Sequence, residues 1–403
     1  MLDVVFLSRI IPIDMKAEVL SKRKGTMSES GESLQWKLIN GLDANLDQPV
    51  TLMNFMPIQS YPKFYSEPYV KGGAFSHTEN AKDINLSFLN MRYIKRLFMG
   101  QSLYREIKKW AKEDRKASKV IVCYSLIPEF MKAIVLAKQV NPEIHVCAVV
   151  ADLPEYTVLT NKIDLSTKIY LNWMKSQTHT RLKYIDSFAL LTEQMADVLV
   201  SKQNYVVVEG IATEIFDEVL ENQASKTKRI LYAGTLNERF GVLQLLEAFR
   251  LTTDSSLTLT ICGIGDAEEK IKKAAQEDIR IEFLGQVDRE EVLRLMKKSA
   301  VIVNPRYVPE EFTKYSFPSK NMEALSSGIP FVAYKLAGIP DEYDPYINYP
   351  KDDRTDTLAA LLETVCKDAD GIYAERAVSA KEWILTEKNA LKQTQKIIDL
   401  IQK

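Results

Sequence analysis

The sequence predicts an α/β protein with two consecutive doubly wound parallel sheets. Short apolar runs recur along the chain, and each is too short and too uniformly apolar for an amphipathic helix, which is typical of buried parallel strands. In the first half these runs are Val4–Leu7, Val120–Tyr124, Ile144–Val150, Ser187–Leu191 and Val206–Val208. In the second half they are Ile230–Ala233, Leu257–Cys262, Ile281–Phe283, Ala300–Val303 and Phe331–Ala333. Helical patterns such as Val242–Arg250 and Arg289–Lys298 alternate with them, as in layered α/β folds.

The length of the chain favours two domains. At 403 residues it is long for one hydrophobic core. Composition turns hydrophilic near Glu209–Gly210 and over Glu221–Lys228, where no periodicity survives. We therefore predict an N-terminal domain at 1–208, a second domain at 209–378, and a helical C-terminal segment at 379–403.

Composition and charge exclude several classes of protein. The net charge of −1 gives no reason to expect nucleic acid as a partner. The four cysteines are widely spaced and the histidines lack ligand-like spacing, so we expect free thiols and no metal site. No charged leader with a long apolar core opens the chain, and no apolar run is long enough to span a membrane. These observations favour a cytoplasmic protein.

Glycine-containing loops follow several strands of the second half. They are Gly234–Gly241, Gly263–Asp266 and Leu284–Val287. Glycine permits a tight turn and a close approach of the backbone to a ligand, and Arg239 in the first loop is able to reach a diphosphate. Each loop alone is also explained by ordinary turn chemistry.

The run Tyr315–Glu323 reads as a helix start suited to an anion. We expect Pro318 at the first helical position with Ser316 or Phe317 as the cap. The backbone N–H groups of the next three residues then point outward at the positive end of the helix dipole. Lys320 adds a full charge, and Glu323 follows on the same face, so a phosphate and a ribose diol have partners. The alternative is a capped helix whose Glu323 is merely solvated.

The order of these motifs resembles the donor domain of GT-B glycosyltransferases of family 4. The resemblance covers most of residues 229–343. It rests on Tyr232–Leu236, Cys262–Gly265, Phe283–Val287, Asn304–Arg306, Ser316–Lys320 with Glu323, and Ser327–Pro330. The N-terminal half is similar more loosely, through Asp152–Glu155, Leu191–Met195 and Val208–Ile211.

This resemblance implies two Rossmann-like domains facing a cleft, with residues 1–208 binding the acceptor and residues 209–378 the nucleotide-sugar donor. The last helix is expected to cross back to the N-terminal domain. It also implies transfer of a sugar from a UDP- or GDP-sugar with retention at the anomeric carbon. No metal and no cofactor beyond the donor are implied. The leaving diphosphate itself then helps to deprotonate the acceptor.

The resemblance also assigns residues. It implies that Glu323 binds the ribose, Ser319 and Lys320 hold the diphosphate, and Gln286 and Val287 face the base. The full set of expected donor-binding residues is Gly234, Thr235, Arg239, Gly263, Gln286, Val287, Arg306, Tyr315, Ser316, Pro318, Ser319, Lys320 and Glu323. The candidate catalytic residues are Lys320, Arg239 and Asp152, with Asp152 a weaker candidate that the role of a loop cap explains equally well.

Four positions depart from the family pattern. Tyr315 replaces the first of two glutamates, Thr235 and Phe240 replace a basic pair, and Ala151 replaces a histidine. Three other residues are available to supply the lost positive charge on the diphosphate: Arg239, Lys320 and Arg306.

Two segments of the first half contain basic and aromatic residues but no acidic residue. Ile84–Arg105 carries Arg92, Lys95, Arg96 and Arg105 among Phe88, Tyr93, Phe98 and Tyr104, and Ser166–Ile185 carries Lys168, Lys175, Arg181 and Lys183 beside Tyr170, Trp173 and Tyr184. Such segments suit an anionic membrane surface or a lipid diphosphate acceptor, although a solvated helix face is the simpler explanation.

We therefore expect a glycosyltransferase acting on a lipid-linked or growing glycan in surface polysaccharide biosynthesis, with peripheral contact at the inner membrane surface. The alternatives are a nucleotide-sugar epimerase of the same fold and a catalytically inactive nucleotide-sugar binding module. The uncharged Thr235 and Phe240 favour the inactive module.

Overall fold

The chain divides into two compact units, each built on its own sheet. The computed structural model describes residues 1–24, 30–92, 95–114, 117–153, 165–215, 228–306, 311–368 and 371–403. The first unit comprises Met1–Ile211 with Ala390–Lys403, and the second comprises Ala212–Asn389. The predicted α/β class with two Rossmann-like sheets is confirmed.

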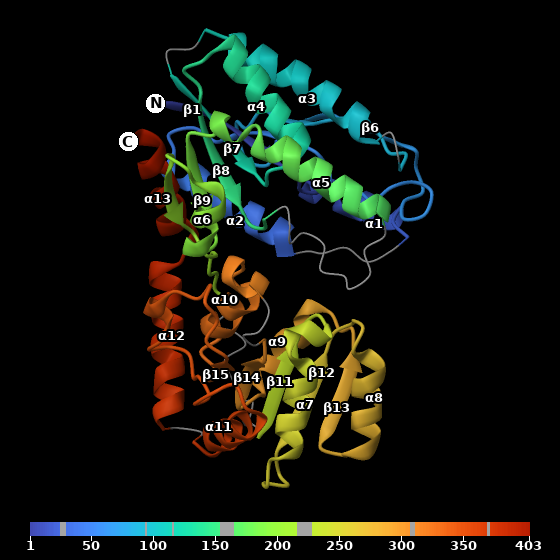
Figure 1. Ribbon diagram of the computed structural model, residues 1–403, viewed down its shortest axis with the longest axis vertical. Coiled ribbons are helices and arrows are strands. Elements are labelled where there is room, and N and C mark those ends of the chain that lie inside the picture. The colour runs from blue at the N-terminus through green and yellow to red at the C-terminus, as the bar shows by residue number, and fades with distance from the viewer. Residues whose placement is uncertain are drawn as a thin grey trace. The chain divides into compact units, whose positions relative to one another are not determined.

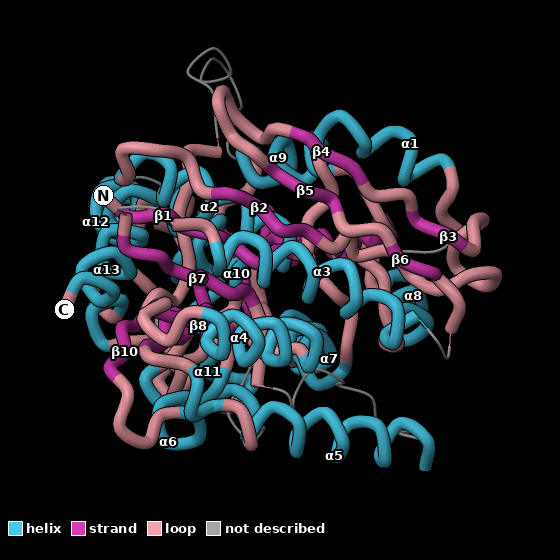
Figure 2. The backbone as a smooth tube through the Cα atoms, turned by 90° about the horizontal axis from the view of Figure 1, so that it is seen from above, coloured by secondary structure: helices cyan, strands magenta, loops and turns pink. Residues whose placement is uncertain are grey.

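The first unit contains a sheet with the strand order β10-β9-β8-β7-β1-β2-β5-β4. Its strands are β1 (Leu2–Ser8), β2 (Thr51–Asn54), β4 (Gly73–Phe75), β5 (Asp83–Asn85), β7 (Ser118–Tyr124), β8 (His145–Val150), β9 (Ser187–Leu190) and β10 (Asn204–Val207). All neighbours are parallel except β4, which runs antiparallel to β5 at the edge. Figure 2 shows these strands in succession. The predicted strands overlap β1, β7, β8, β9 and β10, whereas β2, β4 and β5 were not predicted.

Helices cover both faces of this sheet (Figure 1). They are α1 (Lys16–Ser21), α2 (Ser30–Asn45), α3 (Lys95–Lys112), α4 (Pro128–Val140), α5 (Leu165–His179), α6 (Ala196–Leu199) and α13 (Ala390–Gln402). Helix α13 packs against α2, and Ile397 and Leu400 join the core formed by Val4 and Phe6 of β1. A small antiparallel pair, β3 (Tyr69–Val70) and β6 (Phe88–Leu89), lies apart from the main sheet.

The second unit contains a fully parallel sheet with the order β13-β12-β11-β14-β15. Its strands are β11 (Arg229–Ala233), β12 (Thr258–Cys262), β13 (Ile281–Gly285), β14 (Val301–Asn304) and β15 (Phe331–Ala333). Its helices are α7 (Val242–Arg250), α8 (Glu268–Glu277), α9 (Arg289–Lys297), α10 (Ser319–Ser326), α11 (Thr355–Lys367) and α12 (Ile372–Glu387). Every strand predicted in this half is present.

Alternate residues of β11 face the two sides of this sheet, as the twofold period of a strand requires. Ile230 and Tyr232 pack into one core with α7, α8 and α11. Leu231 packs into a second core with α9, α10 and α12. The continuous apolar sequence of the strand therefore reflects helices on both faces.

The division between the units differs from the predicted domain boundaries. The first unit extends to Ile211 because Val208 and Ile211 are buried in its core. Helix α12 belongs to the second unit, where Ala380 and Ile384 are buried, so only Ala390–Lys403, and not all of 379–403, returns to the first unit. Of the hydrophilic stretch 221–228, residues 221–227 lie outside the described residues.

No described helix is both long enough and apolar enough to cross a membrane.

Candidate active site

The strand order of the second unit creates a switch point between β11 and β14. The chain proceeds outward from β11 through β12 to β13, and then returns to β14 on the other side of β11. Open parallel sheets bind ligands beyond the carboxyl ends of the strands at such points. Gly234 follows β11 and Arg306 lies shortly after β14, so both lie where a ligand is expected.

The turns at this edge are held together by their backbones. The N–H of Gly234 donates to the carbonyl of Cys262 at 2.8 Å, and the N–H of Gly263 donates to the carbonyl of Gly285 at 2.7 Å. Gly263 has φ of +138°, and a Cβ there would lie 1.7 Å from the carbonyl oxygen of Gly234. Glycine is therefore required at residue 263 for the backbones to approach so closely.

Lys320 of α10 reaches across to the end of β11. Its Nζ donates a hydrogen bond to the carbonyl of Ala233, and a Cβ on Gly234 would lie 2.6 Å from that Nζ. Desolvation of the ammonium group lowers the pKa of Lys320 to about 8, with Glu323 opposing and Arg306 adding to the shift. A pKa of about 8 still leaves the ammonium largely charged at neutral pH, and a neighbouring anion would favour that charged form further.

Arg306 supplies a second cation near Lys320. Its guanidinium carbon lies 4.2 Å from the centre of the Phe240 ring, and Nη1 is 3.5 Å from Oγ of Ser316. Desolvation lowers the pKa of Arg306, although a guanidinium remains charged at physiological pH. Phe240, which occupies a position where the resembled family has a basic residue, thus supports an arginine through its ring face.

The start of α10 differs from the prediction. Pro318 is the residue before the first helical turn, not the first helical residue, and neither Ser316 nor Phe317 is the cap. Its ψ of 110° is extended, and its carbonyl accepts the N–H of Asn321 at 2.9 Å. Phe317 is instead buried against Tyr343, with ring centres 5.3 Å apart. The helix therefore begins at Ser319, one residue later than predicted. The N–H groups of Ser319 and Lys320, at the first turn, have no acceptor within the helix.

Glu323 forms an ion pair with an arginine that the sequence did not predict. Nη1 of Arg289, the first residue of α9, lies 3.0 Å from Oε1 of Glu323, and both side chains are substantially exposed. Arg289 comes two residues after Val287, in the segment expected to face a base. No motif indicates Arg289, because the pairing depends on two helices that are distant in sequence.

The other predicted donor-binding residues lie at the same edge of the sheet. Gln286 is exposed after β13, and Val287 packs partly against the core. The carbonyl of Thr235 accepts a hydrogen bond from Oη of Tyr232 at 2.8 Å. Arg239 lies in a short 3-10 turn, where its N–H donates to Oδ1 of Asn237 at 2.9 Å. Tyr315 is half-buried and ends another short turn.

Asp152 lies in the first unit, just beyond β8. Desolvation raises the pKa of its carboxyl group. Burial first and Asp152 second raise the pKa of the nearby Tyr124 phenol. Pro154 and Glu155, which belong to the same sequence motif, lie outside the described residues. Asp152 therefore follows a strand of the first unit's sheet, whereas the cluster around Lys320 lies beside the sheet of the second unit.

A known protein family matches most of the second unit. Residues 214–382 match the family model described as Glycosyl transferases group 1. The second unit contains a group 1 glycosyltransferase domain. No curated protein matches this chain by sequence at a significant level.

Solved structures match the whole chain. The lipopolysaccharide outer core galactosyltransferase WaaB is 14% identical with a TM-score of 0.63, over 100% of this chain and 99% of that one. Sucrose-phosphate synthase from Thermosynechococcus elongatus is 15% identical with a TM-score of 0.65, over 99% and 98%. HepE from Anabaena, solved in complex with UDP, is 14% identical with a TM-score of 0.60, over 99% of each chain. At these identities the likeness establishes the fold, which is GT-B.

Proposed function

We propose that this glycosyltransferase moves a sugar from a UDP- or GDP-sugar to an acceptor hydroxyl with retention at the anomeric carbon. The observation that carries the proposal is the convergence of Lys320, Arg306 and the first turn of α10 beside the backbone of Gly234. Two cations and free backbone N–H groups suit a diphosphate. The UDP bound to the similar HepE structure supports a uridine nucleotide.

In the proposed reaction, the bond between the anomeric carbon and the β-phosphate oxygen breaks, and the acceptor oxygen bonds to the same face of that carbon. The acceptor proton passes to an oxygen of the leaving diphosphate. Lys320 and Arg306 stabilise the negative charge that develops on the diphosphate, an effect worth about 3 kcal/mol for a well-placed donor. Arg239 is proposed to assist them, Glu323 to hold the ribose diol, and Asp152 to orient the acceptor.

The proposed acceptor is a lipid-linked or growing glycan of a surface polysaccharide, met at the inner membrane surface. The exposed face of α5 supports this proposal, because Ile169 is 63% and Trp173 46% exposed, one helical turn apart and beside the exposed Lys168. Apolar and basic side chains on one helix face suit an anionic bilayer. Other parts of the basic segments give less support, since Lys95 donates to the carbonyl of Ile58 and Arg181 to that of Gln177. Tyr93 and the side chains of Arg96 and Tyr170 lie outside the described residues.

Binding to phosphatidylserine vesicles tests the membrane contact. Binding that falls steeply with added salt, and that is weakened by Trp173→Ala, is the expected result. Binding that is absent or indifferent to salt would remove this part of the proposal.

Donor turnover tests the function itself. The full chain is incubated with a panel of UDP- and GDP-sugars, and release of the nucleoside diphosphate is followed with and without EDTA. We expect one donor to be turned over, with no loss on chelation. An inactive binding module would show a thermal shift with a nucleotide sugar but no turnover, and an epimerase would return the donor with an inverted sugar carbon.

A further inference from the structure

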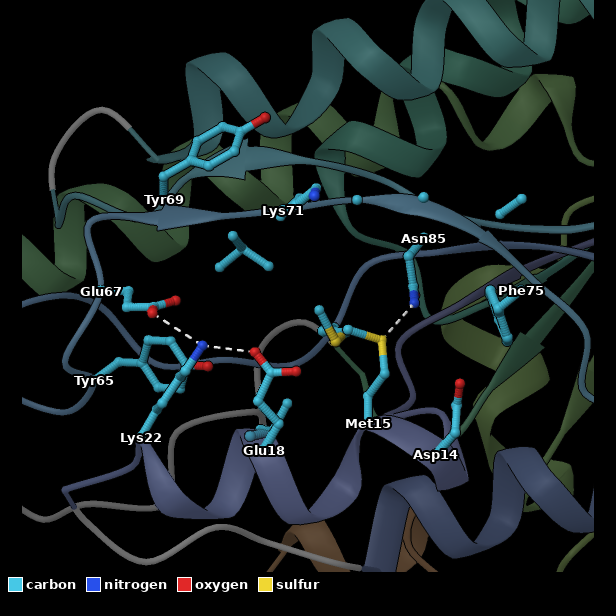
Figure 3. Close-up of a pocket in the computed structure, with 16 residues that line it drawn as sticks. Asp14, Met15, Glu18, Lys22, Tyr65, Glu67, Tyr69, Lys71, Phe75 and Asn85 are labelled. Atoms are coloured by element: carbon cyan, nitrogen blue, oxygen red, sulfur yellow. Dashed lines mark hydrogen bonds and ion pairs between the residues drawn. The ribbon is translucent and has the colours of Figure 1, made fainter.

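The first unit contains a cavity of about 540 Å³ that no predicted site residue lines. Helix α1 forms one wall, and the segment from Tyr69 to Phe75, which includes β3 and β4, forms the opposite one (Figure 3). The volume lies in the range of small-molecule sites. The cavity is therefore large enough to receive a ligand within this unit alone.

The cavity lies at the carboxyl ends of the strands. Asn85 ends β5, Met56 follows β2, and Met15 belongs to the segment after β1. Nδ2 of Asn85 donates to Sδ of Met15 at 3.2 Å, while its Oδ1 accepts from Nδ2 of the buried Asn54 at 2.6 Å. Ligands of open α/β sheets bind at this edge, and here the floor is fixed before any ligand arrives.

Three charged side chains in a row line one wall of the cavity. Nζ of Lys22 lies 2.6 Å from Oε1 of Glu18 and 2.9 Å from Oε1 of Glu67. An ammonium has three N–H donors, so one remains for a ligand, and each carboxylate keeps acceptor capacity. Figure 3 shows the three side chains meeting beside Tyr65.

The charge of the lining argues against an anionic ligand. Carboxylates come from Asp14, Glu18 and Glu67, and ammonium groups from Lys22 and Lys71. The sum is one net negative charge, and the single ammonium of Lys22 is shared between the carboxylates of Glu18 and Glu67. A phosphate or a uronate would meet more carboxylates than cations, whereas neutral hydroxyl groups can donate to the carboxylates and accept from the lysines.

We infer that this cavity binds an uncharged saccharide unit of the acceptor through the wall formed by Glu18, Lys22 and Glu67. The inference rests on the proposed glycosyltransferase function. The Tyr65 ring lies beside this wall and supplies aromatic surface for the apolar face of a sugar ring (Figure 3). The anionic portion of a lipid-linked acceptor would have to be held elsewhere.

Thermal unfolding of the full chain tests the inference. The probes are the methyl glycosides of glucose, galactose, mannose and N-acetylglucosamine, with glucuronic acid and glucose 6-phosphate as charged counterparts. At saturation we expect at least one methyl glycoside to raise Tm by about 2–4 °C, and the charged probes to raise it less. Lys22→Met and the nearly isosteric Glu67→Gln should each abolish the shift.

Lys272→Met is the matched control, because Lys272 also bridges two glutamates, Glu268 and Glu269, at 2.9 Å each but lies in the second unit. This variant should keep the sugar-dependent shift. The inference is overturned if no neutral glycoside raises Tm, if a charged probe raises it more, or if both cavity variants retain the shift. UDP is tested in parallel: loss of its effect alone would count against the proposed donor chemistry and leave the saccharide site standing.

Discussion

Backbone hydrogen bonds join the turns at the carboxyl edge of both sheets, but in the first unit buried side-chain amides add a second set of bonds. Gly234 and Gly263 each donate an N–H to the carbonyl of the neighbouring turn. In the first unit, Asn54 accepts from Oγ of Ser8 at 3.0 Å and from the N–H of Ile10 at 2.8 Å, and donates to Asn85 at 2.6 Å. In the first unit, side-chain amides thus add a second chemistry to the same edge of the same kind of sheet.

The difference explains where ligand specificity can vary. In the proposed function, a site built from backbone groups, Lys320 and Arg306 recognises what all donors share, the diphosphate and ribose. A site lined by side chains from α1 and the segment 65–75 can change its ligand by single substitutions. Donor binding should therefore depend on few side chains, and acceptor binding on many.

The largest effect is expected from Lys320→Ala. Removing the ammonium beside the diphosphate should lower donor turnover about 100- to 1000-fold. Lys273→Ala, an exposed lysine of the same unit, serves as the control. Single-turnover release of the nucleoside diphosphate measures the change. Turnover within a few fold of the unmodified protein would show that the lysine is not part of the reaction.

Substitution of Gly263 should disrupt the backbone edge. Gly263→Ala places a Cβ 1.7 Å from the carbonyl of Gly234 at a φ of +138°, so we expect a loss of about 4 kcal/mol in the free energy of unfolding of the second unit. Gly285→Ala also has a positive φ, +64°, but meets nothing within 4 Å and should cost about 1 kcal/mol. Urea denaturation compares the two, and equal losses would contradict the close-approach argument.

Substitution of Asn54 should disrupt the side-chain edge. Asn54→Leu leaves buried groups of Ile10 and Asn85 without hydrogen bonds, at a cost of about 3 kcal/mol. Asn172→Leu, on the exposed face of α5, should cost little. Hydrogen exchange should show the loss in peptides of the first unit alone. Faster exchange in both units would mean that the two edges are not independent.

The opposite edge of the first sheet carries a buried charge cluster that makes stability depend on pH. His77 lies between Asp43 and Asp83, with both ring nitrogens 2.7 Å from a carboxylate oxygen. Burial disfavours the imidazolium, but the two hydrogen bonds outweigh it and raise the pKa of His77 to about 9. This contribution is fully present below about pH 6.5 and is lost as the pH rises through 9.

We therefore expect His77→Gln to cost about 2–3 kcal/mol at pH 6 and much less at pH 10. Unfolding of both proteins across this range gives the difference directly. A difference that stays constant with pH would mean that His77 is neutral in the folded protein.

The smallest effect is expected from Arg289→Ala. The pair with Glu323 is exposed and worth less than about 1 kcal/mol, so UDP affinity should fall by about two- to fivefold. If Arg289 orients Glu323 toward a ribose, the preference for UDP over 2′-deoxy-UDP should also narrow. Arg294→Ala, which removes an exposed arginine that pairs within α9, is the control. An unchanged preference would make the pair purely structural.

The sequence was most informative where backbone geometry determines the site. The turns at Gly234 and Gly263 were predicted because few residues other than glycine fit such turns, whereas the helix start was predicted from its local pattern one residue too early. Arg289 was missed since its partner lies 34 residues away on another helix. The cavity of the first unit was also missed, because α1 and Glu67 come from segments with no periodic pattern.

Helix α13 joins the core of the first unit although it is made after the whole second unit. During synthesis, residues 1–211 leave the ribosome first, but Ile397 and Leu400 reach their places against Val4 and Phe6 only when residues 390–403 have emerged. Part of the apolar surface of the first unit therefore stays uncovered until the last helix is present, whereas the second unit of Ala212–Asn389 needs no later residue. A chain truncated after residue 389 should contain every residue of the second unit and a first unit that lacks part of its core.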